Sequence, residues 1–292
     1  MDLVMFHSGE LPKYIRYTFS QIRLFNPDLT IHFITDKKHI IEQPTLFHTF
    51  GVKVYNKDEY YSNKIEMLTK LMGRDHADFW MITMSRLVYI ETFIGLHNLK
   101  NVFHFENDVL LYRSLSEMYD TFDKLYPSLA ITQGSEHKWM TGFAFIKDYI
   151  SLSKMTHFFI YVLQTYGIKG TIKKYGMDMV HEMSLMAAYH KEQPNRLAPL
   201  PTLPSSDNFN DFNSIFDSAA WGQFVGGTQN EGPGAKPTDH DVSRVLINNP
   251  THSVIWKLDD KNRKVPYYKT EEDCIRINNL HIHSKNLHLY LS

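Results

Sequence analysis

The sequence has little cysteine, no long apolar run and almost no net charge, and each absence removes a class of protein. A single cysteine, Cys274, among 292 residues excludes an intrachain disulfide and a cysteine-based zinc site. No window holds about 18 consecutive apolar residues, so we expect no transmembrane segment. The formal net charge is −1 and no basic run occurs, so we expect neither nucleic acid nor an anionic membrane as a partner.

The N-terminal residues also lack a targeting pattern. Met1 to His7 does not join a basic segment to a long apolar one, so we expect no signal peptide and a cytoplasmic location, in the cell itself or in a host cell. Hydrophobic residues make up 43% of the chain and charged residues 22%, which permits a well-buried core. The length suits one large domain or two small ones.

Apolar runs alternate with helical patterns in the first half of the chain. Strands are predicted at 3–7, 29–34, 52–55 and from 102, and helices at 12–25, 63–72 and 80–96. This alternation is typical of βαβ units, so the predicted fold class is α/β, with a mostly parallel central sheet flanked by helices.

The second half of the chain is less regular. Strands are predicted at 129–132, 143–146 and 280–284, and helices at 149–166 and 177–190. A polar loop is expected at 134–142, an irregular proline-rich segment at 194–204, and a glycine-rich loop at 224–237. The chain therefore divides into a first half with regular strand–helix alternation and a second half without it.

Polar residues stand at the ends of three predicted strands. In parallel sheets, ligands bind at the carboxyl ends of the strands, close to a switch point in the strand order. These three strand ends therefore predict one pocket. The residues concerned are Ser8, Gly9, Thr35, Asp36, Glu106, Asn107 and Asp108.

The third of these ends carries two carboxylates one residue apart. Glu106 and Asp108 lie between Val102–Phe105 and Val109–Leu111, and buried acids are costly unless something pairs with them. Side chains two apart in an extended segment point to the same side, so both carboxylates could face one divalent cation. A helix cap or a solvated turn at a strand end is the alternative interpretation.

A histidine pair with a following lysine lies close to the C-terminus. His281 and His283 share one face of the predicted strand at 280–284, and Lys285 follows directly. Imidazole suits a borderline ion such as Mn²⁺, and an ammonium group suits a phosphate. A solvent-facing histidine pair and a metal-dependent hydrolase site remain alternatives.

Three further features are weaker. Arg86 on the helix before the acidic segment is either a ligand contact or a surface arginine. Asp178 and Glu182 are four apart on the predicted helix 177–190 and so share a face, which indicates either a substrate contact or a solvated surface. Trp221 and Gly222, beside the glycine-rich loop, either stack on a sugar ring or fill the edge of a core.

Together these residues resemble a GT-A-fold glycosyltransferase, of the glycogenin type and related capsule- or glycan-building enzymes. The span that carries the resemblance is 85–115: Ser-Arg-Leu on a helix, an apolar strand, and an acid-x-acid triplet followed by Val-Leu-Leu. Two features depart from the family: the triplet begins with Glu106 rather than Asp, and the C-terminal segment is compact. The resemblance implies a single Rossmann-like catalytic domain over 1–292, with a nucleotide-binding half at about 1–125 and an acceptor-binding half at about 126–292.

The resemblance also implies roles for individual residues. Arg86 would bind the nucleotide, Asp36 would lie near its base or ribose, and Lys285 would meet the phosphates. Glu106, Asp108 and either His283 or His281 would hold a divalent metal, Mn²⁺ first and Mg²⁺ second. The His7–Ser8, Thr35, Asn107 and Trp221–Gly222 positions would complete the nucleotide-sugar site.

The implied reaction moves a hexose or pentose from a UDP- or GDP-sugar to a hydroxyl of a glycan, glycoprotein or glycolipid. An inverting enzyme needs a carboxylate to deprotonate that hydroxyl, and Glu182, Asp178 and Asp217 are the candidates in that order. A sugar nucleotidyltransferase usually has a glycine-rich basic loop at its N-terminus, which His7-Ser8-Gly9-Glu10 is not. A non-catalytic glycan- or nucleotide-binding relative is the other alternative.

Overall fold

The structure is a computed structural model that describes residues 1–73, 78–228, 231–234 and 253–292. The strands are β1 Asp2–Phe6, β2 Thr30–Thr35, β3 Val52–Asn56, β4 Val102–His104, β5 Val109–Leu111, β6 Leu129–Ser135, β7 Lys138–Ile146, β8 Leu197–Leu200, β9 Ser214–Ile215, β10 Ser253–Leu258, β11 Lys264–Lys269, β12 Cys274–Ile277 and β13 Asn279–His281. The α-helices are α1 Ile15–Phe25, α2 Lys37–Glu42, α3 Pro44–Thr49, α4 Asn63–Met72, α5 Asp78–Leu96, α6 Tyr119–Leu125, α7 Tyr149–Tyr175, α8 Glu182–Glu192, α9 Phe209–Phe212 and α10 Ala220–Gly226. Two 3₁₀ turns, η1 Lys57–Tyr60 and η2 Leu287–Tyr290, are also present.

The central sheet has the strand order β3-β2-β1-β4-β7-β6-β8. β1 pairs in parallel with both β2 and β4, while β7 runs antiparallel to its neighbours β4 and β6. The prediction of a mostly parallel α/β sheet flanked by helices is therefore confirmed. Strand order reverses between β1 and β4, which makes their carboxyl ends the switch point where ligands bind in such sheets. The sheet takes β6, β7 and β8 from the second half of the chain.

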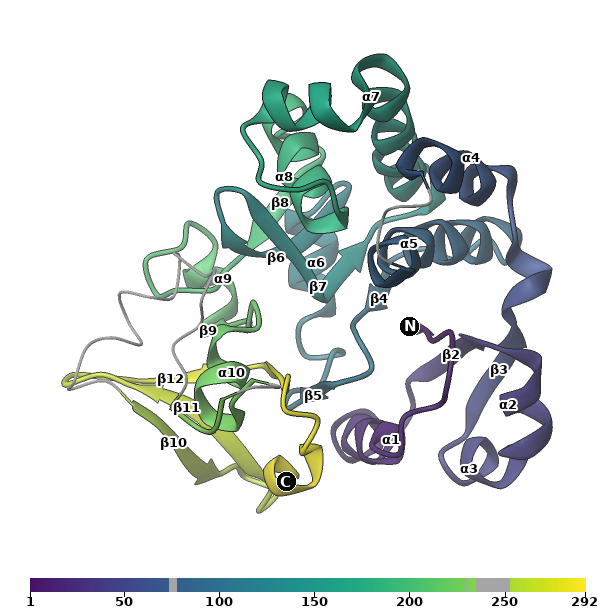
Figure 1. The fold of residues 1–292 in the computed structure, drawn as a ribbon. Coiled ribbons are helices and arrows are strands. Elements are labelled where there is room, and N and C mark those ends of the chain that lie inside the picture. Colours follow the sequence, from purple (N-terminus) through teal and green to yellow (C-terminus); the bar gives the residue numbers. More distant parts are fainter. Residues whose placement is uncertain (74–77, 229–230, 235–252) are drawn as a thin grey trace.

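Alternation along the strands divides the core between the two faces of this sheet. Val4 and Phe6 face a cluster that includes buried residues of α4, α5, α7 and α8, whereas Leu3 and Met5 face a cluster with α1, α3 and α6. Figure 1 shows the first group of helices in the upper part of the view and α1 and α3 in the lower part. Period-two alternation of this kind is what a sheet covered on both faces requires.

Within the described part of the chain, α5 alone is long and apolar enough to cross a membrane, by length and composition. Its segment Phe79–Leu96 is 61% buried inside the protein. α5 packs against β1, α4 and α7, and so lies in the core. This burial is typical of a core helix and agrees with the prediction of no transmembrane segment.

The C-terminal segment builds a second sheet beside the first. β10, β11, β12 and β9 form a four-stranded sheet, drawn from green to yellow in Figure 1. After it, β13 leaves this sheet and pairs antiparallel with β5, with His281 opposite Val109. A third apolar cluster, which includes Tyr112, Trp221 and Tyr268, fills the space between these elements.

Several predicted elements differ from the observed ones. The predicted polar loop 134–142 is wrong: β6 and β7 form a hairpin that is strand on both sides of Glu136–His137. Trp139 in β7 is fully buried, so this segment carries core residues as well as polar ones. The predicted strand at 102–111 is two strands, β4 and β5, with the acidic triplet between them.

Differences also occur further along the chain. The helix predicted at 177–190 begins at Glu182, because His181 caps it by accepting from the Ser184 N–H. α7 breaks at Gly167, whose φ of 63° is not helical, so the predicted end at 166 matches this break; a second helical stretch then runs to Tyr175. β8 lies in the segment predicted to be irregular, and α10 covers the start of the predicted loop 224–237. Residues 229–230 and 235–237 of that loop lie outside the described residues.

Candidate functional site

Pairing of β13 with β5 brings the C-terminal histidines to the acidic triplet. The ladder ends with His281 opposite Val109, and the Ile282 N–H donates to the carbonyl of Asp108. This places His281 Nε2 at 3.2 Å from Asp108 Oδ1 and 3.8 Å from Glu106 Oε2. The two carboxylates that the sequence predicted to face one cation thus both approach one imidazole.

Asp108, His281 and His283 form a compact group of metal-ligand atoms. One candidate ligand atom from each residue lies within 4.8 Å of the others, and Asp108 and His281 are buried. The Gln223 side-chain amide lies 2.8 Å from His283 Nδ1 and orients this ring. One carboxylate with two imidazoles is a donor set that suits a divalent first-row metal ion. These residues therefore fit the metal that the sequence predicted.

Asp108 is also the centre of charge in this group. Burial alone would raise the pKa of Asp108, but His281 and Lys285 hold it well below the usual range of an aspartate. Lys285 Nζ forms an ion pair with Oδ2 of Asp108, while His281 approaches Oδ1. Burial and the neighbouring His281 lower the pKa of His283 to about 3, so this imidazole stays neutral and able to bind a metal.

Glu106 lies beside this group and is held by Arg86. The buried Arg86 Nη2 donates to Glu106 Oε1 at 3.2 Å and to Thr141 Oγ1 at 2.6 Å, and Thr141 in turn donates to the same Glu106 oxygen. Burial would raise the pKa of Glu106, but the Arg86 guanidinium and His281 lower it to about 2. Arg86 is therefore not the surface arginine of the alternative interpretation. No local sequence pattern marks Thr141, on β7, as a residue of this site.

The carboxyl ends of β1, β2 and β3 form a second polar group. Lys57 Nζ bonds Ser8 Oγ at 2.6 Å and Asp36 Oδ1 at 2.7 Å, and Asp36 Oδ2 accepts from the Gly9 N–H at 2.8 Å. Burial alone would raise the pKa of Asp36, but hydrogen bonds from Lys57 and Gly9 lower it below its usual value. Lys57 was not singled out in the sequence, although it follows β3 as Ser8 follows β1.

His7 and Asn107 connect the two polar groups. Asn107 Nδ2 donates to the carbonyl of Phe6 at 3.0 Å and lies 3.2 Å from His7 Nδ1. Asn107 therefore ties the end of β1 to the turn that carries Asp108. Thr35 is fully buried at the end of β2, and its hydroxyl has no hydrogen-bond partner among the described residues.

The three candidate bases occupy different environments. Asp178 is exposed and lies before α8, so the predicted shared helix face with Glu182 is wrong. Glu182 is 3% exposed and accepts from Thr83 Oγ1 at 2.6 Å; burial raises its pKa above the usual value. Asp217 is fully buried and accepts from the backbone N–H groups of Trp221, Gly222 and His281, so it orders backbone at the start of α10 and in β13.

Trp221 and Gly222 have structural roles in this protein. Trp221 is 1% exposed and packs against Tyr268 at 4.9 Å between ring centroids, so the predicted stacking on a sugar ring is wrong and the core-edge alternative is correct. A Cβ on Gly222 would lie 2.1 Å from the carbonyl oxygen of His281. Only glycine lets α10 approach β13 this closely.

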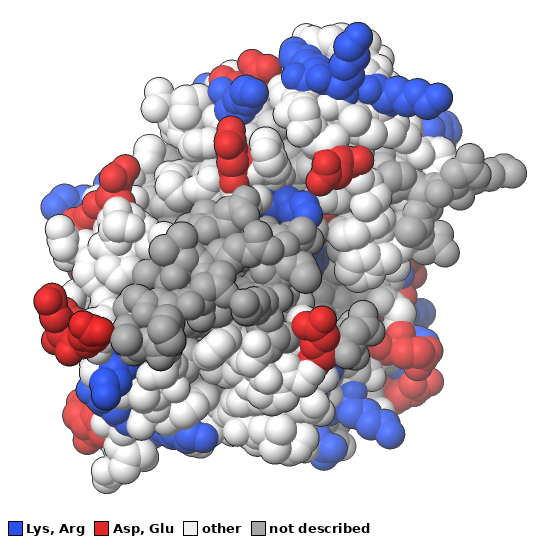
Figure 2. Space-filling model, turned by 60° about the vertical axis from the view of Figure 1, so that its left-hand side comes forward, with Lys and Arg blue, Asp and Glu red and all other residues white. Residues whose placement is uncertain are grey.

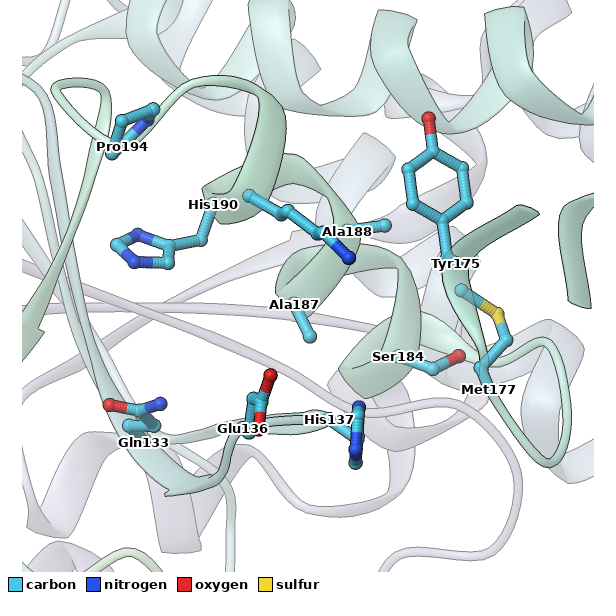
Figure 3. Close-up of a pocket in the computed structure, with 11 residues that line it drawn as sticks. Gln133, Glu136, His137, Tyr175, Met177, Ser184, Ala187, Ala188, His190 and Pro194 are labelled. Carbon is cyan, nitrogen blue, oxygen red and sulfur yellow. The ribbon is translucent and has the colours of Figure 1, made fainter.

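A pocket of 360 Å³ lies between the tip of the β6–β7 hairpin and α8. Figure 3 shows Gln133, Glu136 and His137 on the hairpin side, with Tyr175 and Ser184 on the helical side. His137, which lines this pocket, directly precedes β7, and Thr141, which contacts Arg86 and Glu106, lies four residues further along, roughly 13 Å in an extended strand.

Charge on the surface is mixed. Among the described residues on the face in Figure 2, acidic and basic side chains both occur and neither sign covers the face. This agrees with the formal net charge of −1.

No family model and no curated protein matches this chain. Solved structures similar to it include apo mouse xyloside xylosyltransferase 1, with a TM-score of 0.47 and 12% identity over 69% of this chain and 86% of that one. Glycosyltransferase GlyE of Streptococcus pneumoniae TIGR4 has a TM-score of 0.44 and 13% identity over 73% of this chain and 46% of GlyE. Galactosyltransferase LgtC, in complex with donor and acceptor sugar analogs, has a TM-score of 0.43 and 14% identity over 69% of this chain and 74% of LgtC. All three are glycosyltransferases by name; likenesses this distant give this chain no family, donor, acceptor or reaction.

Proposed function

We propose that this protein is a metal-dependent glycosyltransferase that moves a sugar from a nucleoside-diphosphate sugar to a hydroxyl of a glycan, glycoprotein or glycolipid. The observation that carries the proposal is the group formed by Asp108, His281, His283 and Lys285. It lies at the carboxyl end of β4, beside β1, where the strand order reverses. Carboxylate and imidazole ligands next to an ammonium group suit a metal-bound diphosphate.

Asp108, His281 and His283 would hold the cation, Mn²⁺ in first place and Mg²⁺ in second. The bound ion would supply Lewis-acid stabilisation of the diphosphate, whose negative charge increases as the glycosidic bond breaks. The ammonium of Lys285 is paired with Oδ2 of Asp108, next to the metal ligands. From there it would donate hydrogen bonds to the phosphate oxygens. Arg86 would fix Glu106, through the shared contact with Thr141, at the wall of the same site.

The acceptor would enter from the side of the β6–β7 hairpin. The pocket there presents Gln133, Glu136, His137 and Ser184, which are donors and acceptors suited to sugar hydroxyls. Glu182 lies two residues before Ser184 on α8. It is our choice for the base that removes the acceptor proton, because burial raises its pKa toward the range of a general base. Asp217 is fully engaged with backbone N–H groups, and Asp178 is exposed, so both are weaker choices.

The test is a calorimetric titration of UDP and of GDP, with and without Mn²⁺, into the wild type and Asp108→Ala. We expect one nucleotide to bind in the presence of Mn²⁺ and the variant to lose that binding. Asp120→Ala, an exposed aspartate of α6, is the matched control and should bind as the wild type does.

The outcomes separate the candidate functions. Metal-dependent binding followed by transfer from a matching sugar nucleotide supports the transferase. Binding with no transfer or donor hydrolysis across a panel of sugars would favour a non-catalytic relative. No binding of either nucleotide with any divalent metal would overturn the proposal.

A further inference from the structure

Helix α7 carries basic side chains and no acidic one. Its 27 residues include Lys154, Lys169, Lys173 and Lys174, but neither aspartate nor glutamate. In Figure 2 basic side chains form a group at the upper edge of the molecule, the height at which Figure 1 draws α7. The formal net charge of −1 for the whole chain therefore conceals a local concentration of positive charge.

Three of these lysines lie on the short segment that ends α7. Lys169 and Lys173 are exposed and four residues apart, so they share a face of this segment, and no described residue forms an ion pair with either. Lys174 pairs with Glu192 at 3.7 Å, and its ammonium also lies 4.4 Å from the centre of the Tyr166 ring. Three positive charges thus have one acidic partner, and such a face is complementary to a negatively charged surface.

The helix dipole explains only part of this arrangement. Lysines in the last turn of a helix are stabilised by the partial negative charge there, which accounts for Lys173 and Lys174. Lys169 instead lies in the first turn of the segment that follows Gly167, where the dipole disfavours a cation. Lys169 and Lys173 also repel each other slightly at this spacing. A contact outside this chain explains Lys169 better than the stability of the helix does.

Exposed aromatic side chains accompany the lysines. Tyr161 is 58% exposed and Tyr166 is 37% exposed, both on α7. Tyrosine presents an apolar ring and a polar hydroxyl, and it is enriched where a protein meets the interface between a membrane and water. Lysines and tyrosines on an outer helix are a combination that binds membrane surfaces with anionic headgroups.

The chemistry and position of this face favour a lipid surface over other anions. A lysine ammonium acts as a point charge, whereas specific recognition of a phosphate or carboxylate commonly uses the bidentate fork of arginine, and α7 has no arginine. Figure 1 draws α7 along the outer edge of the molecule, where a broad surface can approach it. A membrane lets several lysines act together without a specific geometry.

We propose that the face of α7 formed by Tyr161, Tyr166, Lys169, Lys173 and Lys174 docks on an anionic phospholipid surface. The lysines supply attraction to the headgroups, and the tyrosines enter the interfacial layer. The net charge predicted no such partner, but a sum over the chain does not record where its charges lie.

Docking in this way would bring the pocket between the β6–β7 hairpin and α8 close to the membrane. Tyr175 lines this pocket and lies two residues after Lys173, about 3 Å along the helix axis. With the acceptor in this pocket, a glycolipid is the acceptor class that docking favours. This selection rests on the proposed function, whereas the docking itself requires no nucleotide, metal or transfer.

The test is cosedimentation of the full chain with lipid vesicles. Vesicles of phosphatidylcholine alone are compared with vesicles of phosphatidylcholine and phosphatidylserine in equal parts, at low and at high salt. We expect the wild type to bind only the acidic vesicles and to be released by salt, which screens surface charge. The triple variant Lys169→Gln, Lys173→Gln, Lys174→Gln should bind roughly a hundredfold more weakly, since each lysine near an anionic surface contributes about fivefold.

The matched control is the triple variant Lys37→Gln, Lys100→Gln, Lys261→Gln. It loses the same charge from exposed lysines outside α7, so it should bind as the wild type does. Tyr161→Ser should also weaken binding to the acidic vesicles while leaving its salt dependence unchanged, because burial of an aromatic ring involves no charge. Thermal unfolding verifies that each variant is folded.

Every other outcome overturns the proposal. Absence of wild-type binding to acidic vesicles excludes the docking, and equal loss in the two triple variants assigns the binding to net charge alone. Retention of binding in the α7 triple variant assigns it to another surface. Binding to heparin but not to vesicles assigns α7 to a soluble polyanion. None of these results bears on the titration of nucleotides, so the transferase proposal stands or fails separately.

Discussion

His281 Nε2 lies 3.2 Å from Asp108 Oδ1, and a strand pairing between distant parts of the chain is what brings them together. Asp108 follows β4, whereas His281 ends β13, which leaves the second sheet to pair with β5. The fold of the C-terminal sheet and the chemistry of the acidic triplet are therefore coupled. Anything that shifts β13 should change the candidate metal site as well.

The two histidines of the C-terminal segment can be separated by mutation. We expect His281→Asn and His283→Asn each to weaken Mn²⁺ binding by tenfold or more, because each removes one of three ligands. Gln223→Leu should weaken it about tenfold, since Gln223 orients the His283 ring. Isothermal titration of Mn²⁺ measures all three. His288 is an exposed histidine in the same segment, so the control variant His288→Gln should bind Mn²⁺ as the wild type does. Full retention of Mn²⁺ affinity in both His281→Asn and His283→Asn would exclude this metal site.

Arg86 should contribute to stability as well as to the site. Arg86→Met leaves the Glu106 carboxylate without its guanidinium partner, and we expect the free energy of unfolding to fall by about 3 kcal/mol. Arg86→Lys should recover part of this loss, because it restores the charge without the planar fork. Urea denaturation followed by tryptophan fluorescence gives these values. Arg196→Met, on the turn before β8, is the control; an unchanged stability of Arg86→Met would contradict the role assigned to the pair.

Glu182 provides a pH-dependent prediction with a definite sign. Because its folded-state pKa is raised by burial, the folded protein binds this proton more tightly than the unfolded chain does. Stability from this group is present below the ordinary glutamate pKa of 4.5 and is lost as pH rises through the raised value. The stability of Glu182→Gln relative to that of the wild type should therefore be higher at pH 8 than at pH 4. Thermal unfolding at both values measures the difference.

The same variant tests the proposed base. If Glu182 accepts the acceptor proton, Glu182→Gln should lower turnover by about 10²–10⁴-fold while the nucleotide still binds. Glu42→Gln, at the exposed C-terminal end of α2, should leave turnover unchanged. Normal turnover in Glu182→Gln would remove this residue from the mechanism.

Gly222 should couple α10 to the metal group. A Cβ there would lie 2.1 Å from the His281 carbonyl oxygen, so Gly222→Ala must displace either α10 or β13. We expect a loss of roughly 1–3 kcal/mol in stability, typical of overpacking, together with weaker Mn²⁺ binding. Gly232→Ala, where a Cβ would meet nothing within 4 Å, should change neither. Wild-type Mn²⁺ affinity in Gly222→Ala would show that β13 tolerates the shift.

Local sequence determined the elements and the residue types at their ends. Apolar alternation and helical periodicity placed β1, β2, β3, α4 and α5 to within a few residues, because these patterns report which side of each element is buried. Polar residues at the strand ends then located the candidate pocket, since a parallel sheet collects its carboxyl ends at one edge. Asp108 was found in this way, whereas His281 and His283 were found as a histidine pair followed by Lys285.

The tertiary structure decided which of those residues meet and what each one does. Trp221 and Asp217 have local sequences compatible with a sugar site, yet the packing of α10 against β13 buries both, one as core and the other as a backbone clamp. Lys57 gains its significance only from contact with Ser8 and Asp36. Periodicity records burial within one element, whereas partners such as these are chosen by long-range strand pairing, which no local pattern encodes.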